Sequence, residues 1–384
     1  MVFSNIITAM YSRTLESALR LDRNNYPVLA ITGPRQTGKT TLAREIFGDY
    51  HYILLEDPDL RDLARSDPRG FFERYPGNLV LDEVQKAPEL LSYLQGRVDA
   101  EPNLHFVLTG SENLLLSEKI AQSLAGRVRT FHLLPLSREE IKQETAMKTL
   151  FYGGYPRIHE KSLDPTVWCG QYYSTYVQRD VRSILNVGDL DQFDRFVRVT
   201  ASRVGQLADF SSIAADCGIS QPTAKAWFSV LKSTFISFSL EPHFKNFGKR
   251  ITKSPKIYFF DTGLLCYLLR IQSEAHLESH PLFGLIFENW VIAERMKKLF
   301  NRGQESLYYF WRDQKGHEVD LVADLAGELH PTEIKSSVTF HESFFKNVDY
   351  LAKLQKKDVN GECIYRGVES FIFKGKKVTS WQDV

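Results

Sequence analysis

The sequence predicts an α/β protein with a parallel sheet in its first third, a mostly helical middle region and a smaller α/β core at its end. Short apolar runs alternate with helical stretches over residues 27–134, and such alternation is typical of a parallel sheet. A helical stretch and several strand-like runs follow residue 281. The chain has 384 residues, too many for one compact core. We therefore expect domains at 1–136, 137–260 and 261–384.

The elements of the first domain can be assigned in order from their apolar patterns. Residues 5–25 resemble an amphipathic helix that leads into the sheet. The expected strands cover 27–32, 52–55, 78–83, 104–109 and 130–134, and the expected helices between them cover 41–47, 59–72 and 112–125. In a parallel sheet of this kind the functional loops lie at the carboxyl ends of the strands.

Composition and charge exclude several classes of protein. The net charge is +1, so no overall basic field attracts nucleic acid, and any such binding must be local. The four cysteines are scattered without a C-x-x-C pair, which argues against a zinc site or a disulfide framework and fits a reducing compartment. No apolar run approaches the roughly 18 residues that span a bilayer, and no signal-peptide pattern opens the chain. We expect a cytoplasmic protein without membrane contact.

Residues 33–41 read GPRQTGKTT and match the phosphate-loop pattern G-x-x-x-x-G-K-[ST]. A strand-length run precedes the loop and a helical stretch follows it, as the motif requires. Backbone N–H groups and the helix N-terminus of such a loop surround phosphate oxygens. Lys39 is expected to reach the β- and γ-phosphates and Thr40 to bind Mg²⁺, so the sequence predicts ATP and Mg²⁺ as ligands. The predicted nucleotide-binding residues are Gly33, Pro34, Arg35, Gln36, Thr37, Gly38, Lys39, Thr40, Thr41 and Asp82.

Polar residues at the ends of two later strands are candidates for catalysis. The run at 78–83 ends in two acids, of which Asp82 is expected to hold Mg²⁺ through water and Glu83 to polarise the attacking water. The alternative is an acidic turn. Thr109 ends the next strand, where its hydroxyl could orient the water or sense the γ-phosphate; the alternative is a cap for the following helix.

Two arginines precede or begin the last strand of the predicted sheet. Ring-forming ATPases of the AAA+ type place at this point an arginine finger that completes the site of a neighbouring subunit. Arg127 is the first candidate and Arg129 the second. A finger implies a homo-oligomer, whereas the alternative is a solvated surface arginine.

The order of these motifs resembles the AAA+ branch of the ASCE phosphate-loop ATPases. The segments GPRQTGKTTL, LVLDEVQKAPEL, VLTGSENLLL, SLAGRV and FYGGYPR resemble a bacterial and archaeal family of AAA-type ATPases that carry a C-terminal domain of unknown function, DUF4143. The resemblance extends through nearly the whole chain. It implies the ATPase fold and the use of ATP, and it says little about the physiological role.

The middle region predicts a lid followed by a winged helix. Residues 153–156 (GGYP) break a helical pattern and could hinge a small lid near the nucleotide. Residues 210–227 have the pattern of a helix-turn-helix, and strand-like runs flank a basic loop beyond it. The predicted DNA contacts are Gln221, Lys225 and Lys232 on the second helix and Lys245, Lys249, Arg250 and Lys253 in the loop. The alternative is a winged helix that serves packing or protein contact.

The last domain carries acids in a pattern that resembles the PD-(D/E)xK core of restriction-endonuclease-like enzymes. Asp320 lies on one expected strand, and Glu333 and Lys335 lie on one face of the next because side chains repeat every two residues. Asp320 and Glu333 would share Mg²⁺, Lys335 would position a water, and Glu288 could complete the site. The alternative is an inactive core that is used for binding.

Together these patterns predict an ATP-hydrolysing AAA+-type protein that couples its nucleotide state to DNA binding or processing. The alternative function is a nucleotide-controlled switch or scaffold that binds a protein partner and has no nuclease activity.

Overall fold

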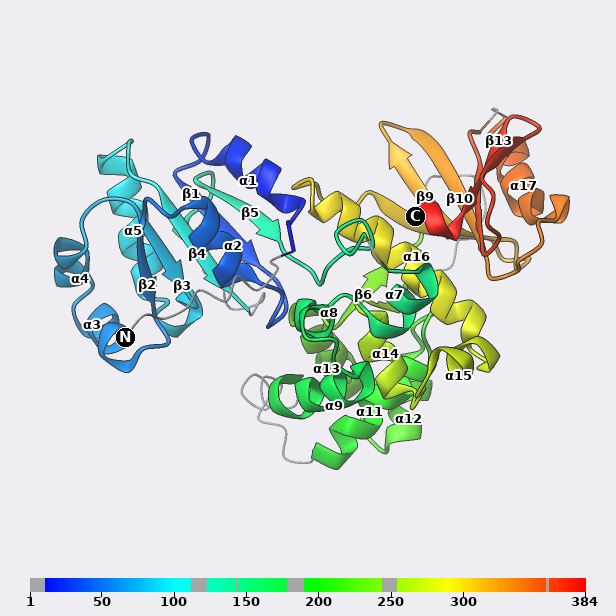
Figure 1. Ribbon diagram of the computed structural model, residues 1–384, viewed down its shortest axis with the longest axis horizontal. Helices are drawn as coiled ribbons and strands as arrows, with labels where there is room; N and C mark the ends of the chain where they lie inside the picture. The colour runs from blue at the N-terminus through cyan, green and yellow to red at the C-terminus, as the bar shows by residue number, and fades with distance from the viewer. Residues whose placement is uncertain (1–10, 112–122, 143, 178–189, 244–253, 357–358) are drawn as a thin grey trace.

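The computed structural model describes residues 11–111, 123–142, 144–177, 190–243, 254–356 and 359–384. The first sheet lies at one end of the molecule and the second sheet at the other, and the helical region lies below and between them (Figure 1). No helix of the described residues is long and apolar enough to cross a membrane.

The first sheet is parallel throughout, as predicted, with the strand order β2-β3-β4-β1-β5. Its strands are β1 (Val28–Thr32), β2 (His51–Leu54), β3 (Leu79–Asp82), β4 (Phe106–Gly110) and β5 (Val128–His132). Every residue of β1, β3 and β4 is buried, which explains their continuous apolar sequences. Because β1 lies between β4 and β5, the loop that follows β1 has a strand end on each side of it at the carboxyl edge of the sheet.

Helices cover both faces of this sheet. They are α1 (Leu15–Asp22), α2 (Lys39–Ile46), α3 (Pro58–Ser66), α4 (Pro68–Arg74), the short 3₁₀ turn η1 (Val84–Lys86) and α5 (Leu90–Ala100). Helices α1 and α2 pack on one face, while α3, α4 and α5 pack on the other. The single helix expected at 59–72 is two helices, because Asp67 caps the second one through Gly70 N and Pro68 begins it. Most of the helix expected at 112–125 lies outside the described residues.

The middle region is mainly helical. It contains α7 (Ala146–Tyr152), α8 (Pro156–Glu160), α9 (Pro165–Tyr172), the π-helix η2 (Tyr173–Val177), α11 (Leu190–Ser202), α12 (Phe210–Cys217), α13 (Gln221–Ser233), β6 (Ser237–Leu240), β7 (Lys256–Phe259), α14 (Thr262–Leu268) and α15 (Glu274–Ser279). Gly218 turns the chain between α12 and α13 with φ of 69°, and the Ser220 side chain caps α13. Strands β6 and β7 pair antiparallel, so the elements expected for a winged helix occur in the expected order.

The last region forms a six-stranded mixed sheet in the order β12-β13-β11-β10-β9-β8. Its elements are α16 (Phe283–Phe300), β8 (Tyr308–Arg312), β9 (Glu318–Leu325), β10 (Glu328–Lys335), η3 (Glu342–Phe345), α17 (Lys346–Gln355), β11 (Glu362–Tyr365), β12 (Phe371–Phe373), β13 (Lys376–Ser380) and η4 (Trp381–Asp383). Leu321 of β9 packs in the cluster that includes α16, whereas its neighbour Val322 packs against Leu351 of α17. Since neighbouring strand residues point to opposite faces, α16 and α17 cover opposite faces of this sheet.

An aromatic contact at the end of β5 joins the three regions. The His132 ring lies 5.4 Å from the Phe235 ring, which follows α13, and 5.1 Å from the Phe300 ring at the end of α16. The Thr32 hydroxyl lies 2.8 Å from His132 Nδ1. An imidazole ring in this apolar setting is more stable when it is neutral.

We predict that acidification weakens this junction. Burial lowers the pKa of His132 to about 4, below the ordinary value near 6.5, so the unfolded chain binds the proton more readily. The neutral His132 ring therefore contributes its full share to the free energy of unfolding above pH 6.5, and this contribution is lost as the pH falls toward 4. At pH 5 this group alone should reduce the free energy of unfolding by about 2 kcal/mol relative to pH 7.

Denaturant titrations of the wild type and His132→Gln at both pH values would measure this effect. The difference between pH 5 and pH 7 should be smaller in the variant by about that amount. An equal pH dependence in the two proteins would contradict the assignment.

Candidate functional site

The predicted phosphate loop joins β1 to α2 at the carboxyl edge of the first sheet. A β-carbon on Gly33 would lie 2.2 Å from the Leu133 carbonyl oxygen, so only glycine fits there. Gly38 has φ of 93° and begins α2. Lys39 is buried, and its Nζ donates to the carbonyl oxygens of Gly33 at 3.0 Å and Pro34 at 2.8 Å. The Lys39 ammonium group is thus held against the loop, and the loop leads into the N-terminus of α2. Both carry positive potential, so the loop fits a phosphate ligand.

The Asp82 carboxylate at the end of β3 is the centre of this edge. It is 1% exposed, and its Oδ2 accepts a hydrogen bond of 2.8 Å from Thr40 Oγ1 and another from the Tyr52 hydroxyl. Its Oδ1 accepts from Thr109 Oγ1. Burial and the hydrogen bond to Asp82 raise the pKa of Tyr52, so the phenol stays protonated and donates. The structure therefore brings together Thr40, Asp82 and Thr109 and adds Tyr52, which the motifs do not indicate.

Glu83 follows Asp82 in a left-handed backbone conformation, with φ of 57°. Such a conformation is unfavourable for a residue with a side chain, and it is often found at functional sites. The Glu83 backbone N–H donates to Thr109 Oγ1 at 3.3 Å, so Thr109 connects both acids. Glu83 Oε2 accepts from Gln85 Nε2 and, at 3.4 Å, from Ser111 Oγ. The turn therefore holds the Glu83 carboxylate beside the carboxyl end of β4.

A buried arginine that the sequence motifs do not indicate ties the phosphate loop to the chain beyond β5. Arg13 Nη1 donates to the Thr37 carbonyl oxygen at 2.7 Å, and its Nη2 donates to the Leu134 carbonyl oxygen at 2.8 Å. Its Nε forms a 3.0 Å ion pair with Glu140. Burial would raise the pKa of Glu140, but the Arg13 charge and the backbone N–H donors outweigh it and lower that pKa.

A small cavity lies beside the phosphate loop. Its lining comes from the phosphate loop, α2, the N-terminal segment, the segment after β5 and both ends of α8. The lining residues are Tyr11, Arg13, Thr37, Gly38, Thr41, Leu42, Glu45, Leu136, Pro156 and Glu160. Of the expected hinge at 153–156, Pro156 lines this cavity, whereas the Gly154 N–H donates to Asp261 Oδ2 at 2.7 Å.

The phosphate loop also contacts the π-helix of the middle region. Gln36, with φ of 62°, donates through Nε2 to the Tyr176 hydroxyl at 2.9 Å. The Arg35 guanidinium lies 5.6 Å from the centre of the same ring. Both residues belong to the variable positions of the motif, and both contact the Tyr176 side chain of the middle region.

The two finger candidates differ in their surroundings. Arg127 pairs with Asp99 at the surface and lies before β5, opposite the edge that carries the phosphate loop. The intervening strand of five residues separates the two edges by about 16 Å, so Arg127 does not reach the site of its own chain. Arg129 donates to the Gly303 carbonyl oxygen at 2.6 Å, which connects it to the last region.

The predicted DNA contacts on α13 share one exposed stripe, because Gln221, Lys225 and Lys232 are separated by four and seven residues. Gln221 Nε2 donates to Ser211 Oγ at 2.9 Å. The four loop residues of this prediction, at 245, 249, 250 and 253, lie outside the described residues.

The acids of the last region are paired with lysines. Lys335 Nζ lies 3.0 Å from Asp320 Oδ2 and also contacts Glu333, so these three predicted residues do meet. Burial raises the pKa of Glu333, and the negative charge of Asp320 adds to this shift. Burial also tends to raise the pKa of Asp320, but the charge of Lys335 outweighs it and lowers that pKa.

The predicted fourth member of this cluster, Glu288 of α16, lies near enough for burial and the charge of Asp320 to raise its pKa, but its hydrogen bonds go to other residues. It accepts from the Tyr258 hydroxyl at 2.5 Å and from Lys256 Nζ at 3.1 Å. Lys256 also pairs with Glu318 at 2.5 Å. Over the part of the chain that the structure describes, no group of three or more acids, histidines or cysteines is arranged to hold a metal ion.

We predict that Tyr52→Phe lowers the free energy of unfolding by about 1–3 kcal/mol, because a buried carboxylate loses one of its hydrogen bonds. Tyr26→Phe is the matched control, since Tyr26 packs in the same apolar cluster on the sheet. Denaturant titration of both variants would measure the difference, and equal stability of the two would show that the hydroxyl of Tyr52 does not support Asp82.

Comparisons with known proteins match three consecutive regions. Residues 25–142 match an AAA domain, residues 143–275 a domain of unknown function (DUF8612) and residues 283–383 another (DUF4143). An uncharacterized protein of Mycobacterium tuberculosis is 32% identical over 340 residues, which cover 87% of this chain and 76% of that protein. An uncharacterized protein of Methanocaldococcus jannaschii is 22% identical over 90% of this chain and 85% of its own length. Among solved structures, a Walker-type ATPase of Pyrococcus abyssi has a TM-score of 0.46 and 17% identity, and covers 67% of this chain and 96% of its own.

Proposed function

The chain belongs to the family of P-loop proteins that combine an N-terminal AAA domain with a C-terminal DUF4143 domain, and we propose that it binds and hydrolyses ATP with Mg²⁺. The observation that carries this proposal is the Asp82 carboxylate. It is buried and held by three hydroxyl donors, and within the described residues it forms no ion pair. A buried charge without a counter-ion is unfavourable, and a divalent cation would supply one.

The residues around Asp82 fit a magnesium ion because hydroxyl and carboxylate oxygens are the ligands that this ion prefers. Thr40 and Asp82 would hold it, and the bound ion would neutralise charge on the phosphates. Lys39 would exchange its bonds to the loop carbonyls for bonds to phosphate oxygens. Glu83, fixed by its turn, would hold the attacking water and take its proton, and Thr109 would keep both acids in register.

The cavity beside the phosphate loop is the proposed site of the nucleotide base. It holds about 50 Å³ of free space, which is too little for a base until its walls move apart. Pro156 and Glu160 belong to α8, so a movement of this short helix would widen it. We propose that α8 opens and closes over the base as a lid, with the expected hinge at 153–156.

Arg127 would act on a neighbouring copy of the chain. It is about one-third exposed, distant from its own phosphate loop and held by a surface ion pair with Asp99 and a hydrogen bond of 3.0 Å to the Ala125 carbonyl oxygen. Surface ion pairs of this kind contribute little free energy, so the guanidinium can leave it at little cost. This supports an assembly in which one protomer completes the site of the next.

The partner of the ATPase cycle is proposed to be DNA. The exposed stripe on α13 supports this, because its lysines can reach phosphates while the helix lies in a groove. The competing function is a nucleotide-controlled switch that binds a protein and leaves DNA alone. The contact of Gln36 with Tyr176 suits either function, since it connects the phosphate loop to the middle region in both.

A second candidate activity concerns the last region. The order α16-β8-β9-β10-α17-β11 and the meeting of Asp320, Glu333 and Lys335 support a PD-(D/E)xK-like core. Lys335 is the lysine that a cleaving core itself requires, whereas the ion pair of Glu288 with Lys256 favours an inactive core that is used for binding.

We predict that Glu83→Gln reduces steady-state ATP turnover by at least about 100-fold while ATP binding is retained, because the variant lacks the general base. Lys39→Ala should instead abolish binding. Phosphate release and the binding of a fluorescent ATP analogue would measure the two effects, with Glu56→Gln as a control at an exposed glutamate. Turnover in Glu83→Gln equal to that of the wild type would exclude its catalytic role.

We predict that double-stranded DNA stimulates ATP turnover and that the stimulation decreases as the salt concentration rises. The double variant Lys225→Ala, Lys232→Ala should lose the stimulation and keep the basal rate, since neither lysine lies at the nucleotide site. A basal rate that DNA leaves unchanged would favour the protein-interaction switch.

A cleavage assay tests the last region. Any Mg²⁺-dependent cleavage of DNA by the full chain should disappear in Asp320→Asn. This variant loses one of the two carboxylates, Asp320 and Glu333, that would bind the magnesium ion together. If the wild type leaves DNA intact with ATP and Mg²⁺ present, the region is a binding core and not a nuclease.

A further inference from the structure

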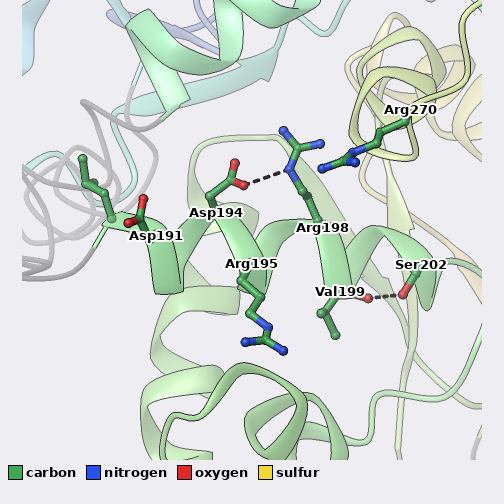
Figure 2. A pocket seen from close by; sticks show the side chains of 8 residues that line it. Asp191, Asp194, Arg195, Arg198, Val199, Ser202 and Arg270 are labelled. Atoms are coloured by element: carbon green, nitrogen blue, oxygen red, sulfur yellow. Dashed lines mark hydrogen bonds and ion pairs between the residues drawn. The ribbon is translucent and has the colours of Figure 1, made fainter.

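A cavity of about 590 Å³ lies along α11, and its lining includes no residue of the phosphate loop (Figure 2). Its lining residues are Leu190, Asp191, Asp194, Arg195, Arg198, Val199, Ser202 and Arg270. All but the last come from α11, at intervals of three and four residues that form one side of the helix. The opposite side of α11 packs Phe193 and Phe196 against Trp227, so the helix itself is well anchored.

Two guanidinium groups from different elements meet at this cavity. Arg198 is held in place, with its Nε 2.8 Å from Asp194 Oδ2 and its Nη1 donating to the Leu268 carbonyl oxygen at 3.2 Å. Its guanidinium lies 5.5 Å from the centre of the Tyr267 ring. Figure 2 shows Arg270 extending from the turn after α14 toward Arg198, so that the two side chains point to one another.

The charges at this place are not balanced. Three arginines and two aspartates line the cavity, and Asp194 is already paired with Arg198. Within the described residues, neither Arg195 nor Arg270 forms a hydrogen bond or an ion pair through its guanidinium. Two like charges that face each other repel, and an anion between them would remove this repulsion.

The backbone of Arg270 is a second and independent observation. Its N–H bonds to the Tyr267 carbonyl oxygen, and the N–H of Ile271 bonds to that of Cys266, which is the pattern of a Schellman cap at the end of α14. In this cap the residue at Arg270 takes a left-handed conformation, here with φ of 60°, and glycine is strongly preferred there. Helix α12 ends with Gly218 at the equivalent place. An arginine at such a position is explained by what its side chain does, because the cap alone is better served by glycine.

We propose that this cavity binds a phosphate group, with Arg198 and Arg270 as its two principal ligands and Arg195 at its side. A guanidinium presents two parallel N–H donors that match two phosphate oxygens, which makes arginine pairs selective for phosphate esters. The phosphate would belong either to a nucleic-acid backbone or to a small phosphorylated molecule. The site is independent of the phosphate loop and of the stripe on α13, and it does not rest on the proposed ATPase activity.

The test uses the full chain with Lys39→Ala, so that phosphate binding at the nucleotide loop does not contribute. Pyrophosphate and a short single-stranded oligonucleotide are titrated by calorimetry and by fluorescence anisotropy. Arg198→Ala and Arg270→Gly should each weaken binding by about 10- to 100-fold, as expected for the loss of a charge-assisted hydrogen bond. Arg69→Ala, at an exposed arginine of the first domain, should leave it unchanged.

Arg270→Gly separates a binding role from a structural one. Glycine relieves the strained backbone, so this variant should unfold at the same temperature as the wild type or at a higher one while it loses the ligand. If the variants lose affinity only for the oligonucleotide, and the parent binds the oligonucleotide more tightly than pyrophosphate and in a salt-dependent way, the phosphate belongs to a nucleic acid. If they lose affinity only for pyrophosphate, the ligand is a small phosphorylated molecule. The proposal is wrong if neither probe binds, or if Arg270→Gly binds both as well as its parent.

Discussion

The nucleotide site depends on one buried carboxylate that has hydrogen bonds but no counter-ion. Asp82 receives hydroxyl donors from Thr40, Tyr52 and Thr109, which lie on α2, β2 and β4. These neutral donors fix the position of the carboxylate and bring no positive charge to it. A lysine or arginine paired with Asp82 would stabilise the fold more directly, but its charged group would occupy the place of a divalent cation. The arrangement thus leaves the carboxylate available to a cationic ligand, and it connects β3 to helix α2 and to the strands β2 and β4.

The sequence was sufficient for the sheet and for the meeting of Thr40 with Asp82, since the motif and the apolar runs specify which residues end parallel strands at one edge. It was insufficient for Tyr52 and Arg13. Tyr52 contacts Asp82 only because β2 pairs beside β3, and no short pattern encodes that neighbour. Arg13 meets Glu140 across 127 residues of sequence. Contacts of this kind arise from tertiary packing, and a single sequence contains no local signal for them. The break between α3 and α4 shows the same limit on a smaller scale, although a proline after an aspartate was visible there.

The connections of the phosphate loop suggest how a nucleotide would act on the rest of the chain. Gln36 reaches Tyr176 of the π-helix, and Arg13 ties Thr37 to the segment beyond β5. The π-helix is a rare element that is frequently found at functional sites. A shift of the loop on phosphate binding would reach this element directly through Gln36. At β5, on the same edge, the His132 ring packs against Phe235 and Phe300 and joins the three regions.

The acids of the last region show the opposite electrostatic arrangement to that of Asp82. Asp320 and Glu333 share Lys335, and Glu288 is neutralised by Lys256, so each of these carboxylates already faces a cation. For Glu288 to bind a metal ion, the buried Lys256 ammonium group would have to be displaced, and the buried ion pair that it forms would be lost. Lys256 belongs to β7, the strand that follows the expected wing, and it is anchored by both Glu288 and Glu318. Any event that moves β7 would therefore release the Glu288 carboxylate. The charge pattern thus links the availability of this cluster to the position of the middle region.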